Sequence, residues 1–189
     1  MIPAGRQYAV SELAKLELSA ARRLELARMF DITGWIRPAL ADIILKRSPK
    51  KLRSITNDDR QRMTEDAYIA IAKALEAIQV ERGYLALRPP PLQILPSCRT
   101  HAACQVVWPK IWFDLVAPRI LNRVEPVPIT DLPWIIRGIP SGKMEILCLL
   151  DTARAFKNNS VLQCEEIFVD QVTEVIKEMY FGRHTVVQE

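Results

Sequence analysis

Apolar residues recur along much of this chain at intervals of three or four positions, the spacing that gathers them on one side of an α-helix. We find no sustained alternation of apolar and polar residues between turn residues, which is the pattern of half-buried strands. The sequence therefore predicts an all-α fold, an irregular bundle of about six to eight helices that forms one domain or two packed subdomains.

The clearest helix boundaries lie in the first half of the chain. Ser19 is a favourable N-cap for a helix over residues 20–30. A second helix should occupy residues 33–45, with Pro38 in its first turn, where a missing amide proton costs no hydrogen bond. The longest helix should run from Thr64 to about Arg82, with an apolar face along its length.

Three consecutive prolines at residues 89–91 end this helical run, because proline removes amide donors and disfavours helical geometry in the preceding residue. We expect an N-terminal helical subdomain over residues 1–88, a proline-rich connector over 89–97, a C-terminal helical subdomain over 98–181 and a flexible tail over 182–189. A proline-rich ligand for another protein is the alternative interpretation of the connector.

The second half of the chain predicts further helices. One should run over residues 104–121, with breaks at Pro109 and Pro118, and two more should follow at about residues 142–157 and 161–181. Five residues spaced by three or four should share the buried face of the first of these helices: Cys104, Trp108, Ile111, Trp112 and Leu115. Two tryptophans on one face fit core packing, with base stacking as the alternative.

Composition supports a folded chain with a modest positive charge. Of its 189 residues 49% are hydrophobic and 25% charged, which is unlike disordered proteins. The net charge of +4 reflects 26 basic against 22 acidic residues. Much of the excess lies in the run Lys46–Arg53, which we interpret as a solvated loop, with a phosphate-binding patch as the alternative.

No apolar run approaches the roughly 18 residues that span a bilayer, and the N-terminus lacks the apolar core of a signal peptide. We therefore expect the protein in the cytoplasm or nucleus, with no membrane partner. In those reducing compartments the four cysteines favour free thiols or metal ligands over disulfides.

The densest group of metal-binding residue types is Cys98-x2-His101-x2-Cys104. Thiolate sulfur and imidazole nitrogen suit a zinc ion. Positions three apart on a helix are rotated by about 300°, so these three ligands cannot converge from one regular helix. A turn at Pro96–Ser97 should therefore place Cys98 and His101 on a knuckle, with Cys104 in the helix that follows.

A structural zinc site needs a fourth ligand. We favour Cys148, which lies in an apolar segment expected to pack inward, over Cys164, which we expect to be an ordinary thiol on a helix face; His184 is a weaker alternative. Inert buried thiols and disulfide or redox use are the competing interpretations of the cysteines. Four protein ligands would leave no position for water, so the predicted site is structural rather than catalytic.

Catalytic motifs are absent from the sequence. It contains no phosphate-binding loop, dinucleotide-binding, zinc-protease or nucleophile-elbow motif. The adjacent carboxylates Glu165 and Glu166, like an earlier pair of aspartates, are expected on solvated faces. A dyad of Cys104 and His101 lacks an orienting third residue. We therefore expect no enzyme, no catalytic residues and no small-molecule substrate.

Four features of residues 8–155 carry a family resemblance. They are, in chain order, YAVSEL at 8–13, ELARMFDITGWIRPAL at 25–40, LALRPPPL at 85–92, and the spacing Cys98-x2-His101-x2-Cys104-x3-Trp108-x3-Trp112 followed by Cys148. Together they resemble the helical, BACK-like region that follows the BTB/POZ domain in proteins of basidiomycete fungi. The resemblance implies a helical region that accompanies a protein-interaction domain.

No sequence resembling the BTB domain itself precedes Tyr8. Dimerisation through that domain and recruitment of a cullin-type ligase are therefore not expected of this chain. We expect a non-enzymatic interaction or scaffold module with protein partners, stabilised by zinc at Cys98, His101, Cys104 and Cys148. The alternative is a basic, metal-stabilised module that binds nucleic acid.

Overall fold

The computed structural model describes residues 3–45, 56–122, 126–157 and 160–182. Helices dominate these ranges, and no strand occurs within them, so the predicted all-α class is confirmed. The basic run Lys46–Arg53, His184 and all but the first residue of the predicted tail lie outside the described residues.

The chain forms two compact units. Of the described residues, the first unit contains 3–45, 56–75 and 168–182, and the second contains 76–122, 126–157 and 160–167. The divisions fall inside two long helices, α5 (Glu65–Leu87) and α10 (Cys164–Phe181). The subdomain boundaries proposed around residues 89–97 stay a prediction.

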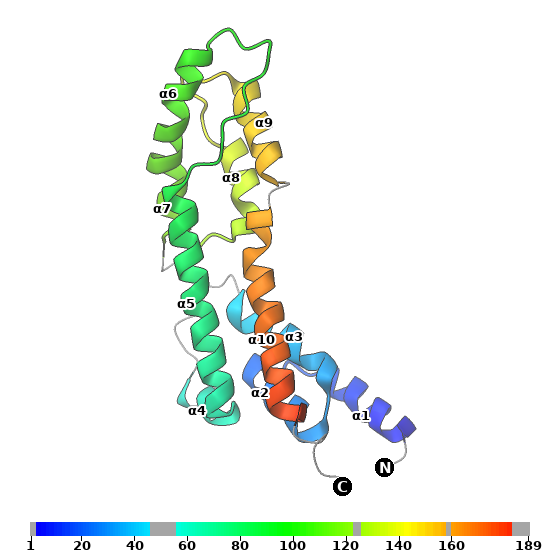
Figure 1. The fold of residues 1–189 in the computed structure, drawn as a ribbon. Helices are drawn as coiled ribbons and strands as arrows, with labels where there is room; N and C mark the ends of the chain where they lie inside the picture. The colour runs from blue at the N-terminus through cyan, green and yellow to red at the C-terminus, as the bar shows by residue number, and fades with distance from the viewer. Residues whose placement is uncertain (1–2, 46–55, 123–125, 158–159, 183–189) are drawn as a thin grey trace. The chain divides into compact units, whose positions relative to one another are not determined.

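The first unit contains the N-terminal helices together with parts of α5 and α10 (Figure 1). Its remaining helices are α1 (Pro3–Ala14), α2 (Ala20–Phe30), α3 (Ile36–Ile44) and α4 (Asn57–Arg62). Helix α2 begins and ends where the sequence predicts. The Ser19 hydroxyl accepts a hydrogen bond from the amide of Arg22, and Asp31 closes the helix in a left-handed conformation at φ 55°.

The core of the first unit is aliphatic and is drawn mainly from the four helices α2, α3, α5 and α10. Its fully buried side chains include Leu24, Ile36, Leu40, Ile71 and Ile176. Ion pairs lie around this core: Arg23 pairs with Asp42, and Arg37 Nε lies 2.7 Å from Asp170 Oδ1. Because these charges are partly exposed, each pair contributes at most about 1 kcal/mol, and apolar burial dominates the stability of the unit.

The second unit is built from the C-terminal part of α5, the first turn of α10 and a set of shorter helices. These are α6 (His101–Ile111), a π-helical turn (Trp112–Val116), α7 (Ala117–Ile120), α8 (Leu132–Arg137) and α9 (Ile146–Lys157). Short 3-10 turns precede α8 and α10, at Ile129–Asp131 and Ser160–Gln163.

The π-helical turn corrects one sequence prediction. Leu115 was expected on the buried face, but it is 41% exposed and Val116 is buried in its place. The amide of Ala117 bonds to the carbonyl of Trp112, five residues earlier, so this turn holds one residue more than an α-helical turn. The inward face is therefore displaced by one position along the sequence.

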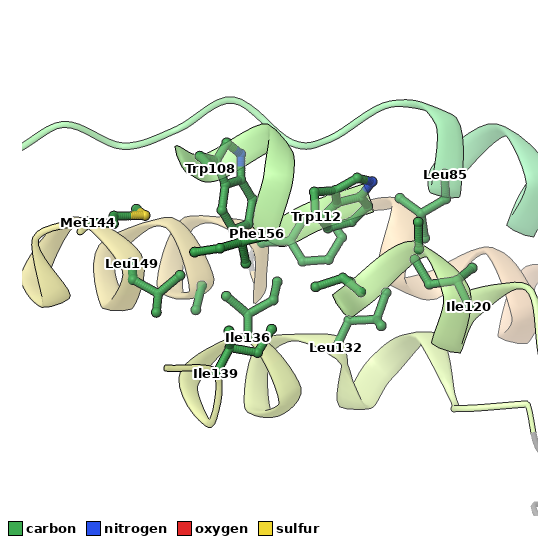
Figure 2. Packing of buried hydrophobic residues seen from close by; sticks show 14 of the residues in the cluster. Leu85, Trp108, Trp112, Ile120, Leu132, Ile136, Ile139, Met144, Leu149 and Phe156 are labelled. Atoms are coloured by element: carbon green, nitrogen blue, oxygen red, sulfur yellow. The ribbon is translucent and has the colours of Figure 1, made fainter. Parts of the chain in front are cut away.

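Aromatic side chains lie at the centre of the second unit (Figure 2). The rings of Trp108 and Trp112 are 5.8 Å apart, and Phe156 meets Trp112 edge-on at 6.1 Å. Trp112 has no exposed surface. Aliphatic residues of α8 and α9, such as Ile136 and Leu149, complete this core. Core packing of the two tryptophans, as predicted, is what the structure shows.

A buried ion pair corrects a second prediction. Glu165 was expected on a solvated face, yet it is only 8% exposed and accepts hydrogen bonds from Arg82. The Nε atom of Arg82 lies 2.9 Å from Glu165 Oε1, and Nη1 lies 3.4 Å from the carbonyl oxygen of Ile120 at the end of α7. The positive charge of Arg82 therefore allows the carboxylate of Glu165 to be buried, whereas a pair of adjacent acidic residues without such a partner would stay in solvent.

None of the described helices combines the length and the apolar character required to cross a membrane.

Candidate metal centre

The sulfur atoms of Cys98, Cys104 and Cys148 converge in the second unit and lie within 4.8 Å of one another. All three cysteines are buried, and none forms a disulfide. Cys98 follows a turn closed by its own amide and the carbonyl of Leu95, Cys104 lies in α6, and Cys148 lies in α9. Three separate segments therefore meet at one cluster of sulfur atoms.

The spacing of the sulfur atoms fits a tetrahedral ion. The Sγ atoms of Cys98 and Cys104 are 3.7 Å apart. A tetrahedral zinc ion with bonds of about 2.3 Å to sulfur has sulfur–sulfur edges of about 3.8 Å. The pair thus lies at the separation that a shared zinc ion would impose.

Backbone amides are directed at all three sulfur atoms. The amide of Glu145 donates to Cys104 Sγ at 3.3 Å, and the backbone groups of Thr100 and Leu95 act to lower the pKa of Cys98 and of Cys148. Hydrogen bonds to a thiolate favour the charged form, so the surrounding backbone stabilises negative charge on sulfur.

The electrostatics of the three thiols differ. Burial raises the pKa of Cys98, but the backbone and hydroxyl of Thr100 and the neighbouring thiols outweigh it and leave this pKa below its ordinary value. Burial raises the pKa of Cys148, and the negative charges of Cys98 and Cys104 raise it further. Three adjacent thiolates repel one another, so a divalent cation is the group that would stabilise all three in the charged form.

His101, the remaining predicted ligand, does not belong to the group of clustered ligand atoms. It is exposed, and its Nε2 atom lies 3.1 Å from the carbonyl oxygen of Leu95. A carbonyl only accepts, so Nε2 carries the proton of this hydrogen bond, and in the neutral ring Nδ1 keeps its lone pair. This is the arrangement in which metal-binding histidines are usually oriented by a backbone carbonyl.

The predicted knuckle is shorter than expected. Residues 96–97 form the predicted turn, but α6 already begins at His101, so Cys98 alone lies on the turn. His101 and Cys104 are three positions apart in the same helix, where their side chains share a face. Helix α6, rather than the turn, therefore positions His101 beside the cluster.

Cys164 lies outside the cluster, and its half-buried position near the start of α10 agrees with an ordinary thiol. Burial raises the pKa of Cys164, and the nearby carboxylates of Glu165 and Glu81 raise it further. This cysteine is a natural control, because it is a free thiol of the same unit without clustered neighbours.

Two contributors to the centre were not predicted from the sequence. The hydroxyl of Thr100 lies 3.8 Å from Cys98 Sγ and 3.7 Å from Cys104 Sγ. Leu95 contributes its carbonyl to His101 and its amide to Cys148. Only Thr100 carried a sequence signal, its position inside the Cys-x2-His motif, because backbone groups have no residue-type pattern.

Comparisons of the chain with protein-family models, with curated proteins and with solved structures gave no match. The geometry of the sulfur cluster therefore carries the functional argument.

Proposed function

We propose that this chain is a non-catalytic protein-interaction module whose second unit is held together by a structural zinc ion. The ligands are Cys98, Cys104 and Cys148, with His101 as the fourth. The observation that carries the proposal is the convergence of three buried cysteine sulfur atoms from a turn and two helices.

Zinc fits this donor set better than a hard cation. Thiolates suit zinc and other soft ions, whereas calcium and magnesium need oxygen ligands. An ion bound here would join the turn before α6 to the first turn of α9, and its binding energy would add to the folding energy of the second unit.

His101 is proposed to complete the tetrahedron through Nδ1. Its hydrogen bond to Leu95 leaves that nitrogen unprotonated, and α6 holds the ring one turn before Cys104. Four protein ligands leave no position for a reacting water, so this site stabilises the fold and performs no hydrolysis.

An interaction role is supported by the surface of the second unit. Trp134 on α8 is 65% exposed, and the guanidinium of Arg137 lies 4.9 Å from the centre of its ring. Tryptophan and arginine are the residues that most often dominate binding energy at protein interfaces. The sequence resemblance to a region accompanying BTB domains points to the same class of function. Reduced cysteines would fit a cytoplasmic or nuclear protein.

Native mass spectrometry with metal analysis tests the metal centre. We expect one zinc ion per chain in the wild type, none in Cys104→Ser, and one in the matched control Cys164→Ser. Loss of one ligand should weaken binding by more than the roughly 10- to 100-fold typical of outer-shell changes. A folded, metal-free wild type, or zinc retained at full affinity by Cys104→Ser, would contradict the proposal.

A further inference from the structure

An extended segment, residues 88–98, joins α5 to α6 within the second unit, and we call it the strap. In Figure 1 it is the green trace without helix between these two helices. Four of its eleven residues are prolines, which have no amide proton to donate. Several of its backbone groups bond to side chains of α6 on one side and of α9 on the other.

The α6 side uses tryptophan indoles. Trp108 Nε1 donates to the carbonyl of Pro90 at 2.8 Å, and Trp112 Nε1 donates to the carbonyl of Ala86, just before the strap, at 2.8 Å. Figure 2 shows both indole nitrogens on the side where the extended chain runs. His101 adds a third contact by donating to the carbonyl of Leu95.

The α9 side receives strap amides. Gln93 donates its amide proton to the hydroxyl oxygen of Thr152 at 2.9 Å, and the amide of Leu95 acts on Cys148. Thr152 in turn donates to the carbonyl of Cys148 at 2.7 Å. The strap is therefore attached to α9 at two places: at Thr152, one turn beyond the proposed ligand Cys148, and at Cys148 itself.

Apolar packing of the strap is weaker than that of the core it covers. Its side chains Leu92, Ile94 and Leu95 are only partly buried, whereas Trp112 and Leu149 beneath are fully buried. Segments with few buried apolar contacts open at lower free energy than the core around them. The contacts at the end of the strap therefore decide whether it stays closed.

We propose that the metal ion is the clasp of this strap: loss of the metal opens residues 88–98 while α6, α8 and α9 keep their packed core. The proposal rests on the metal centre described above. Cys98 ends the strap and is a proposed ligand, and Leu95 contacts both another ligand and His101. Metal binding and strap closure therefore share their contacts and must stabilise each other equally.

Opening would uncover the edge of Trp108 and the side of α9 that carries Thr152. Metal occupancy would then control which apolar surface the second unit presents to a partner. The device is regulatory, because it changes the surface and leaves the helices in place.

Hydrogen exchange of individual amides, followed by NMR in the full chain, tests the clasp. With free zinc at about 100 times its dissociation constant, an opening that requires metal loss is about 100-fold rarer than without metal. We expect protection at Gln93 and Leu95 to fall by roughly this factor on removal of zinc. The amides of Trp112 and Phe156 should stay clearly better protected than the strap.

Two results would overturn the clasp while leaving the metal centre intact: zinc binds but strap exchange is unchanged, or strap and core amides lose their protection together. A protein that binds no zinc at all would reject both proposals, and the metal analysis identifies that case. The three failures are thus separate.

A matched pair of threonines tests the reciprocal coupling. Thr152 and Thr173 are both buried and both donate to the carbonyl four residues earlier at 2.7 Å, but only Thr152 is seen to accept a strap amide. Thr152→Val should raise the zinc dissociation constant about 2- to 10-fold, as expected for one lost hydrogen bond, and Thr173→Val should leave it unchanged. Equal zinc affinities for the two variants would contradict the coupling.

Discussion

The two units of this chain are stabilised by different kinds of interaction. The first unit is aliphatic inside, its helices have side-chain caps such as Ser19, and its ion pairs are partly exposed. The second unit buries two tryptophans, a charge pair and three sulfur atoms, and it contains an extended segment. Local sequence rules suffice for the first unit, whereas the second depends on groups that meet only in the tertiary structure.

The largest expected contrast concerns buried charge. In the second unit, Glu165→Leu leaves Arg82 buried without its carboxylate and should lower the free energy of unfolding by about 3–5 kcal/mol. In the first unit, Asp170→Leu removes a carboxylate whose pair with Arg37 is exposed, and should cost less than about 1 kcal/mol. Urea unfolding of the two variants measures both values.

A double variant separates charge from packing. Arg82→Met together with Glu165→Leu replaces the buried pair by apolar side chains and should recover most of the lost stability. If the double variant is as unstable as Glu165→Leu alone, the unit depends on the shape of this pair and not on charge compensation.

Helix caps give a smaller contrast. Ser19→Ala removes the hydrogen bond from Arg22 at the start of α2 and should cost about 1 kcal/mol of unfolding free energy. Thr100, at the same position of α6, makes no cap hydrogen bond, and its hydroxyl lies beside two sulfur atoms instead. Thr100→Ala should therefore weaken zinc binding, by up to about tenfold, more than it weakens the helix.

Thermal unfolding and zinc titration of both variants decide this point. A Thr100→Ala variant that loses helix stability but keeps its full zinc affinity would show that the second unit follows the same local rules as the first.

The smallest effect is a pH dependence in the first unit. The hydrogen bond from Arg22 lowers the pKa of Glu25. Burial raises this pKa, and the hydrogen bond from Arg62 lowers it further, so the folded pKa lies below its ordinary value. Because the folded pKa lies below the unfolded value, the stabilisation is present above about pH 4.5 and is lost as the pH falls through the folded value. Glu25→Gln should cost below about 1 kcal/mol at pH 7 and less at pH 3. A difference from wild type that grows toward pH 3 would reverse the assigned sign.

The sequence predicted those features of the fold that are fixed by residues close together in the chain. The bounds of α2 and the first-turn proline of α3 follow from caps and φ restriction, and the structure agrees with both. Cys148, favoured over Cys164 by its apolar context, is the cysteine that clusters with Cys98 and Cys104, and its role as a ligand stays a prediction. These features are local, because a helix start or an inward face is fixed within a few residues.

The features that the sequence did not predict depend on contacts between residues far apart in the chain, or on backbone groups. Leu115 was placed on the wrong face because a π-helical turn breaks the period of 3.6 residues. Glu165 was placed in solvent because its partner Arg82 lies far away in the sequence. The role of Leu95 rests on its peptide group, which every residue possesses, so no sequence pattern could have revealed it.

The most direct measurement for the second unit is X-ray absorption spectroscopy of the zinc-loaded protein at the zinc edge. The proposed centre predicts three sulfur neighbours at about 2.3 Å and one nitrogen at about 2.0–2.1 Å. In His101→Ala the imidazole nitrogen should be lost from the atoms around zinc, and the three sulfur neighbours should be retained. A zinc ion surrounded by oxygen and nitrogen alone would contradict the account, because it would place the metal away from the three buried cysteines.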